Sequence, residues 1–215
     1  MYQTKPVTGN NLVFEDDNCK IMYDFWEEYG NIGFIFTNKT SENIYLHLDE
    51  CFFVKNGIAE DYYQQRVFNG VASVAEKPII FQQRVFNSVA SVVEKPIVCI
   101  PAHASKIVSE FKICSDVFVS CDLKKYPGKK DANSLTFTEK TTPLTFGNRI
   151  AYSIGDSDNL IRIKNDYYVS KISNLTSEEA FIRIDEVVCG KKTSLKTRVF
   201  KESGPDKFYI KYTNP

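Results

Sequence analysis

This 215-residue sequence has few long apolar runs, no excess of basic charge and no recognisable motif of catalysis. No apolar run approaches the roughly 18 to 20 residues that a membrane-spanning helix needs, and the N-terminus lacks the apolar core of a signal peptide. Lys and Arg number 27 against 27 Asp and Glu, whereas nucleic-acid binders usually carry excess basic charge. These absences argue against a membrane-spanning helix and against a nucleic-acid partner.

The motifs that mark catalytic, cofactor or metal sites are also missing. The sequence contains no nucleophile elbow, phosphate loop or dinucleotide fingerprint. Its six cysteines are scattered, with no Cys-x-x-Cys pair of the kind found in zinc ribbons or thioredoxin-like sites. We therefore expect no catalytic residues, no cofactor and no metal. Scattered cysteines fit either buried apolar side chains or, in an oxidising compartment, disulfides.

Phe and Tyr are abundant, with 16 and 12 copies against one Trp and two Met. Both fit the half-buried surface of a pleated sheet, and short stretches of alternating polarity recur between turn signals. The segments predicted as strands are 20–26, 32–37, 43–48, 51–54, 96–100, 106–111, 117–121, 149–154, 160–163, 167–172 and 208–212. This pattern predicts a mainly antiparallel all-β fold, an immunoglobulin-like β-sandwich, as a single domain over 1–215. If the domain is sub-divided, we expect the division near 124–145, a polar stretch.

For two segments, the local sequence pattern gives a more detailed prediction of secondary structure. Ile44 and Leu46 alternate with polar neighbours, which predicts a strand with one core face and one wet face. Near the C-terminus, residues 176–179 resemble a helix start, with acidic residues in the first turn. Residues 181–185 alternate equally well as a strand. A short helix and a strand therefore both remain alternatives for this segment.

A tandem duplication interrupts the chain. Residues 63–80 and 81–98 differ at only four of 18 positions, and two repeats are too few for a solenoid. Because loop-closure entropy grows slowly with length, we expect an inserted duplicated loop at 63–98 on the surface. Each copy would form either a short amphipathic helix or a β-arm, which the Val and Phe content favours. The expected interaction arm comprises Val67, Phe68, Val71, Val85, Phe86 and Val89.

Two further sets of side chains invite a functional interpretation. His47, Asp49 and Cys51 would share one face of a regular strand, where they could bind a metal or pair a thiol with a base. Same-face neighbours stand roughly 7 Å apart, which is wide for a nucleophile and its base. A solvent-facing polar strip is the simpler interpretation. Trp26 fits either a sandwich core or an aromatic binding patch.

Short motifs recur through the N-terminal half: Tyr23-Asp24-Phe25-Trp26, Gly30-Asn31-Ile32-Gly33-Phe34, Asn38-Lys39, Ile44-Tyr45, Phe52-Phe53-Val54, Asn56-Gly57, Glu94-Lys95-Pro96-Ile97 and Ile100-Pro101, with a fainter match at 207–212. With these motifs, the N-terminal half resembles a family of uncharacterised lipoproteins from Bacteroidota. The resemblance implies a sandwich-like fold, an envelope setting and a variable polar loop where the duplication sits. It brings no catalytic residues. The chain departs from the family pattern because no leader or lipid-bearing cysteine precedes Tyr2.

Three functional hypotheses follow. The first is a non-catalytic protein of the bacterial cell envelope, with a structural or protein-interaction role. Its partner would be another protein or a second copy bound through the duplicated arm, and membrane contact would require that a lipidated leader has been removed. The second is a cytoplasmic or mobile-element-encoded binding protein with free thiols. The third is an enzyme that uses His47, Asp49 and Cys51.

Overall fold

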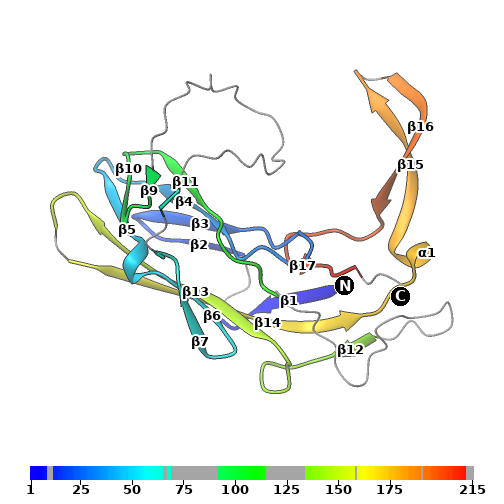
Figure 1. Cartoon of the computed structure of the whole chain (residues 1–215), viewed down its shortest axis with the longest axis horizontal. Coiled ribbons are helices and arrows are strands. Elements are labelled where there is room, and N and C mark those ends of the chain that lie inside the picture. The colour runs from blue at the N-terminus through cyan, green and yellow to red at the C-terminus, as the bar shows by residue number, and fades with distance from the viewer. Residues whose placement is uncertain are drawn as a thin grey trace.

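A computed structural model gives the structure of the chain, with residues 1–8, 12–64, 67–68, 92–114, 134–157, 159–189 and 191–211 described. Two β-sheets pack against each other to form the body of the molecule (Figure 1). Every strand ladder among these residues is antiparallel. The predicted all-β, mainly antiparallel class is confirmed. None of the described helices is long and apolar enough to span a membrane.

The larger sheet has nine strands in the order β10-β5-β13-β14-β1-β17, with β12 beside β14, β6 beside β13 and β7 beside β6. These strands are β1 (Tyr2–Pro6), β5 (Ile44–His47), β6 (Phe52–Lys55), β7 (Ile58–Asp61), β10 (Ile97–Ile100), β12 (Ser134–Thr136), β13 (Thr145–Ile154), β14 (Ile161–Ser173) and β17 (Lys207–Phe208). The N-terminal strand thus lies within the sheet, next to a strand from the C-terminal end of the chain.

The smaller sheet has four strands in the order β11-β4-β3-β2. These are β2 (Val13–Glu15), β3 (Cys19–Tyr23), β4 (Phe34–Asn38) and β11 (Ser105–Val108). Both β3 and β4 alternate strictly between buried and partly buried residues, as strands with one face on a core do.

Aromatic rings fill the space between the sheets. Phe25, just after β3, lies 5.3 Å from Phe146 of β13 and 5.0 Å from Tyr167 of β14, measured between ring centroids. Phe36 of β4 lies 5.4 Å from Tyr152 of β13. Edge-to-face contacts of this kind add to the stabilisation that burial gives. The abundance of Phe and Tyr in the sequence is explained by this core.

The central strand β14 corrects the sequence prediction. The sequence predicts two separate strands at 160–163 and 167–172. They are one strand, since Asn165 accepts a hydrogen bond from the Tyr23 hydroxyl at 2.9 Å. Asp166 is likewise bound by Arg149 at 2.6 Å and by Lys164 at 3.0 Å. Polar side chains with such partners are tolerated inside a sheet.

The turn at Asn56-Gly57 agrees with its sequence signal. Both residues have positive φ, +48° and +83°, as the central positions of a type I′ hairpin turn require. Asn and Gly adopt this conformation at low cost. The turn joins β6 to β7, the outermost pair of this part of the sheet.

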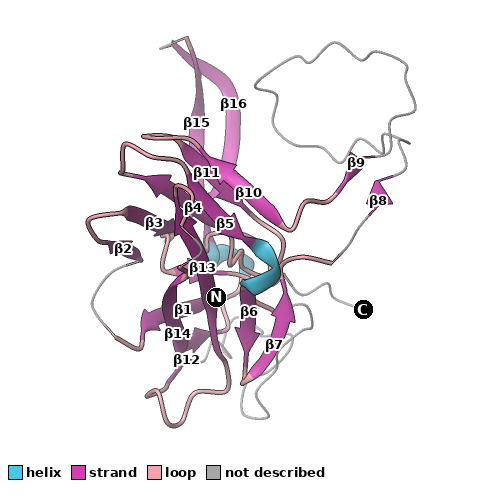
Figure 2. Ribbon diagram, turned by 90° about the vertical axis from the view of Figure 1, so that its left-hand side faces the viewer, coloured by secondary structure: helices cyan, strands magenta, loops and turns pink. Residues whose placement is uncertain are grey.

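Both alternatives for the segment after residue 176 occur in succession. Helix α1 (Ser177–Ala180) is one turn long, and Thr176 caps it in a capping box with Glu179. Strand β15 (Phe181–Val188) begins immediately afterwards and pairs with β16 (Lys191–Phe200). The β15–β16 hairpin extends away from the sandwich in both views (Figures 1 and 2).

Little of the duplicated segment lies within the described residues. Strand β8 (Val67–Phe68) of the first copy pairs with β9 (Val92–Val93) of the second. This pairing fits the predicted β-arm at Val67 and Phe68. The other expected arm residues, Val71, Val85, Phe86 and Val89, lie outside the described residues, as does the segment 117–121 predicted as a strand.

We expect removal of residues 64–81 to leave the fold intact. The deletion puts the second copy's Val85–Phe86 in the sequence position of β8 and keeps β9. It shortens the chain between the paired strands from 23 residues to five, which lowers the loop-closure cost by about 1 kcal/mol. Thermal unfolding should show an unchanged Tm or a rise of a few degrees. A fall of about 10 °C would mean that the repeat belongs to the core.

Candidate functional site

The expected strip of His47, Asp49 and Cys51 is not formed. Strand β5 ends at His47, and the 3-10 helix η1 (Leu48–Glu50) follows it. A helical turn destroys the alternation that would have placed the three side chains on one face. His47 instead lies beside Ser153, with 3.0 Å between Nε2 and Oγ.

Cys51 is fully buried beneath η1. Its sulfur accepts a hydrogen bond from the backbone N–H of Ala151 at 3.3 Å. Burial raises the pKa of the Cys51 thiol to about 12. The thiol therefore remains protonated at neutral pH, whereas nucleophilic and metal-binding cysteines act as thiolates.

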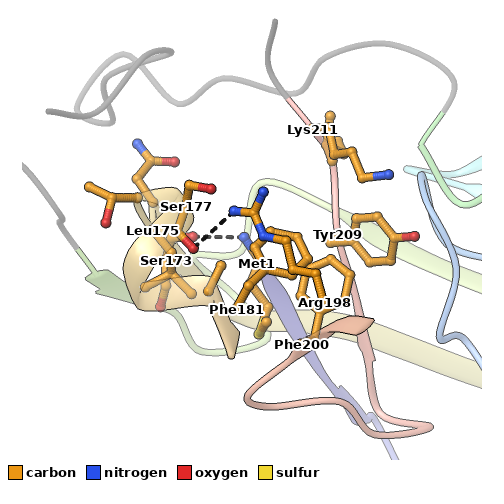
Figure 3. A pocket seen from close by; sticks show the side chains of 13 residues that line it. Met1, Ser173, Leu175, Ser177, Phe181, Arg198, Phe200, Tyr209 and Lys211 are labelled. Atoms are coloured by element: carbon orange, nitrogen blue, oxygen red, sulfur yellow. Dashed lines mark hydrogen bonds between the residues drawn. The ribbon is translucent and has the colours of Figure 1, made fainter. Parts of the chain in front are cut away.

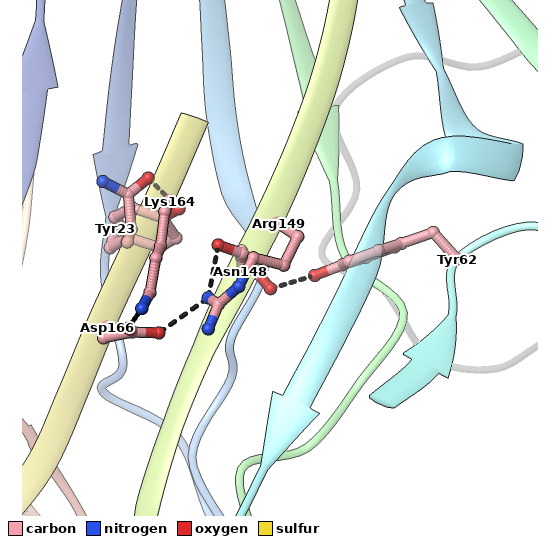
Figure 4. A network of polar contacts seen from close by, with 7 residues as sticks. Tyr23, Tyr62, Asn148, Arg149, Lys164 and Asp166 are labelled. Atoms are coloured by element: carbon pink, nitrogen blue, oxygen red, sulfur yellow. Dashed lines mark hydrogen bonds and ion pairs between the residues drawn. The ribbon is translucent and has the colours of Figure 1, made fainter. Parts of the chain in front are cut away.

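A buried polar network links the two sheets (Figure 4). Asn148 of β13 has no exposed surface. Its Oδ1 accepts a hydrogen bond from the Tyr62 hydroxyl at 2.9 Å, and its Nδ2 donates to the Ile32 carbonyl at 3.1 Å. Throughout the described residues, no buried side-chain nitrogen or oxygen lacks a partner. The network is therefore satisfied within the protein, which suits a role in fixing how the sheets pack.

The β15–β16 hairpin projects from the sandwich (Figure 1), and most of its described side chains are exposed. Opposed residues of an antiparallel pair share a face, and the register pairs Ile182 with Val199 and Ile184 with Thr197. Leu195 of β16 lies just beyond the last regular pair, where the register of the hairpin shifts. The opposite face carries Phe181, Arg183, Asp185, Lys196, Arg198 and Phe200.

The apolar face of the hairpin is open to solvent. Ile182 and Ile184 are each 44% exposed, and Leu195 is 65% exposed. A fully buried side chain of this size contributes about 1.5–3 kcal/mol relative to an exposed one. Exposed on one hairpin, these side chains form a surface that another molecule could cover.

The hairpin also carries positive charge. Residues 181–200 contain five Lys and Arg against two Asp and Glu, a net charge of +3 in a chain whose total is zero. Arg183 and Arg198 lie directly opposite each other, an arrangement of like charges that costs stability unless an anion lies nearby. The hairpin is therefore a basic extension of a neutral protein.

The root of the hairpin is anchored by aromatic rings. Phe200 lies 4.3 Å from Phe181 and 4.4 Å from Tyr209, measured between ring centroids. Trp26 stands edge-on to Phe200 at 5.0 Å and tilted against Tyr209 at 5.2 Å. Trp26 is only partly buried and lies outside the core between the sheets. It therefore belongs to an aromatic patch, one of the two alternatives that the sequence left open.

A cavity of about 470 Å³ opens beside this root (Figure 3). The hairpin contributes Phe181, Arg198 and Phe200, while the sandwich contributes Tyr209 and Lys211 of the C-terminal segment. The remaining walls come from Met1, which precedes β1, from the end of β14, from residues 174–176, from helix α1 and from Ile210. The cavity therefore lies between the root of the hairpin and the sandwich.

Sequence reasoning missed the hairpin as a functional element. The signal was present in two stretches of alternating apolar residues, 182–184 and 195–199, on either side of Cys189-Gly190. Only the first stretch was interpreted as a possible strand. Because residues 195–199 were not predicted as a strand, their pairing with residues 182–184 could not be predicted either.

No group of three or more metal-binding side chains occurs within the described ranges. Comparison with known proteins found no match to any family model, curated protein or solved structure. The resemblance to lipoproteins of Bacteroidota thus depends on the quoted residues alone.

Proposed function

We propose that this chain is a non-catalytic protein-interaction module that binds a partner protein through the apolar face of the β15–β16 hairpin. The observation that carries the proposal is the exposure of Ile182 and Ile184 on one face of a projecting ribbon, with Leu195 exposed on the adjoining stretch of β16. A two-stranded ribbon is marginally stable by itself in water. A partner that covers this face would supply the buried surface that the ribbon lacks.

The edges of the ribbon favour pairing with a strand of the partner. Within the described residues, β15 and β16 pair only with each other, so each strand has an outer edge with unpaired backbone groups. Addition of a strand to such an edge is a common mode of recognition. Backbone hydrogen bonds would provide affinity, and the apolar face would provide selectivity.

The charge of the hairpin favours an acidic partner over a second copy. Two hairpins in contact would bring two segments of net charge +3 together, and like charges in an interface disfavour association. An acidic surface would instead attract the hairpin and accelerate encounter. The hairpin replaces the duplicated arm as the proposed contact, because four of the six arm residues lie outside the described part.

We propose a bacterial envelope location on the basis of the sequence resemblance. The immunoglobulin-like form of the sandwich is likewise a prediction. Both are separate from the contact proposed for the hairpin, which depends on the exposure, register, outer edges and charge of that hairpin.

Photocrosslinking in the native host tests the contact. We expect p-benzoylphenylalanine at position 184 to give a protein adduct, because Ile184 lies at the centre of the apolar face. The matched control is the same substitution at Ile107, which is 68% exposed on β11 of the sandwich. Adducts of equal yield at both positions, an adduct with lipid alone, or an adduct with a second copy would contradict the proposal.

A further inference from the structure

We propose that the cavity at the root of the hairpin binds a small organic anion, its anionic group held by Arg198 and its apolar body against the aromatic rings. The site is separate from the proposed partner contact. Arg198 lies on the face opposite Ile182 and Ile184. The inference does not depend on the proposed function.

The charges that line the cavity have one sign. Arg198 and Lys211 are the charged side chains among the lining residues, and neither Asp nor Glu belongs to the lining. Lys211 is partly compensated, since its Nζ lies 3.4 Å from Glu28. Arg198 forms no ion pair with a carboxylate among the described residues. The uncompensated positive charge at this wall selects for an anion.

The guanidinium of Arg198 is held in place. Its Cζ lies 4.2 Å from the centroid of the Phe181 ring, a cation–π contact. One terminal nitrogen donates to the Ser177 carbonyl at 3.3 Å (Figure 3). A guanidinium has five N–H donors in a planar fork, so most of them are still available to a ligand. A fixed fork loses little entropy when it binds a carboxylate or phosphate in bidentate fashion.

The other walls suit an apolar body. Phe181, Phe200 and Tyr209 are packed ring to ring, and Leu175 also lines the cavity. A volume of about 470 Å³ falls within the range of about 300–1,000 Å³ that takes one drug-sized molecule. An aromatic or short aliphatic group with one carboxylate or phosphate matches both the rings and the charge.

The single tryptophan of the chain provides the readout. Trp26 contacts Phe200 and Tyr209, both of which line the cavity. Titration with phenylacetate or phenyl phosphate should change Trp26 fluorescence to saturation. Phenethyl alcohol, the neutral counterpart, should bind at least about tenfold more weakly. A hydrogen bond between charged groups changes the affinity by about this factor. The preferred anion identifies carboxylate or phosphate as the natural headgroup.

Arg198→Gln should weaken binding of the preferred anion at least about tenfold and leave the alcohol unchanged. Arg183→Gln is the matched control. It removes one positive charge at the position opposite Arg198, but Arg183 does not line the cavity. The expected loss of anion affinity is therefore less than about threefold. Arg198→Lys retains the positive charge but lacks the planar guanidinium, so its affinity for the anion should lie between those of the wild type and Arg198→Gln.

Thermal unfolding of each variant checks that the protein is folded at the temperature of the titration, so that a loss of binding does not reflect unfolding. The proposal is overturned if fluorescence does not saturate with either anion or if the alcohol binds as well as they do. It is also overturned if Arg183→Gln and Arg198→Gln have equal effects. Each of these results leaves the photocrosslinking experiment unaffected, so the two proposals fail separately.

Discussion

Replacing Phe25 with Ala lowers the free energy of unfolding by about 3–5 kcal/mol, the range for deleting a fully buried Phe. The ring is 0% exposed and contacts Tyr23 on its own side of the core as well as Phe146 and Tyr167 from the opposite sheet. Its removal opens a cavity at the junction of the two sheets, where neither backbone can collapse without breaking its ladder. Urea unfolding monitored by circular dichroism measures the loss.

Phe25→Leu is the control for volume. Leu keeps most of the buried carbon but loses the edge-to-face contacts, so we expect a smaller loss of about 1–2 kcal/mol. A loss below about 1 kcal/mol for Phe25→Ala would show that the ring does not lie between the sheets.

Asn148→Ala has the second large effect, a loss of about 2–4 kcal/mol in the free energy of unfolding. The substitution leaves two buried groups without their partner: the Tyr62 hydroxyl, which donates to Oδ1, and the Ile32 carbonyl, which accepts from Nδ2. Leaving a buried donor or acceptor unsatisfied costs about 1–3 kcal/mol, more than the hydrogen bond contributes when it is present. Equilibrium urea unfolding again gives the value.

A double-mutant cycle with Tyr62→Phe isolates the shared hydrogen bond. Once Asn148 is Ala, removing the Tyr62 hydroxyl also removes an unsatisfied group, so the second substitution should cost less than it does in the wild type. We expect a coupling of about 1 kcal/mol or more. Strictly additive losses would mean that the 2.9 Å hydrogen bond does not contribute to stability.

The strands with one buried face could be predicted from the sequence. Ile44 and Leu46 of β5 are fully buried and alternate with Tyr45, which is not. Alternation of apolar and polar residues with a period of two indicates a strand with one face on a core and the other face in solvent. The all-β class follows from several such segments.

The central strand and η1 could not be predicted, because tertiary contacts decide them. Asn165 and Asp166 lie in β14 since Tyr23 and Arg149 satisfy them, and these partners are more than 15 residues away along the chain. The turn of 3-10 helix at Leu48–Glu50 has no clear local signal, so His47 and Cys51 were placed on one face by a regular alternation that the structure does not keep.

The candidate site was harder to predict than the fold. Alternation in β15 shows that Ile182 and Ile184 share a face, but it does not say whether another sheet covers that face. Only the structure shows that the hairpin leaves the sandwich and that these side chains are 44% exposed. The aromatic patch around Trp26 likewise combines residues from the two ends of the chain.

Calorimetry of the crosslinked partner with the purified chain is the most direct test of the apolar face as a binding surface. Ile184→Asp puts a charge on this face, where Ile184 is 44% exposed, so the fold of the chain should be unaffected. We expect this substitution to raise Kd for the partner at least about tenfold. The matched variant Ile58→Asp, at a position 70% exposed on β7 of the sandwich, should change Kd by less than about twofold. Equal Kd values for the two variants would contradict the proposal.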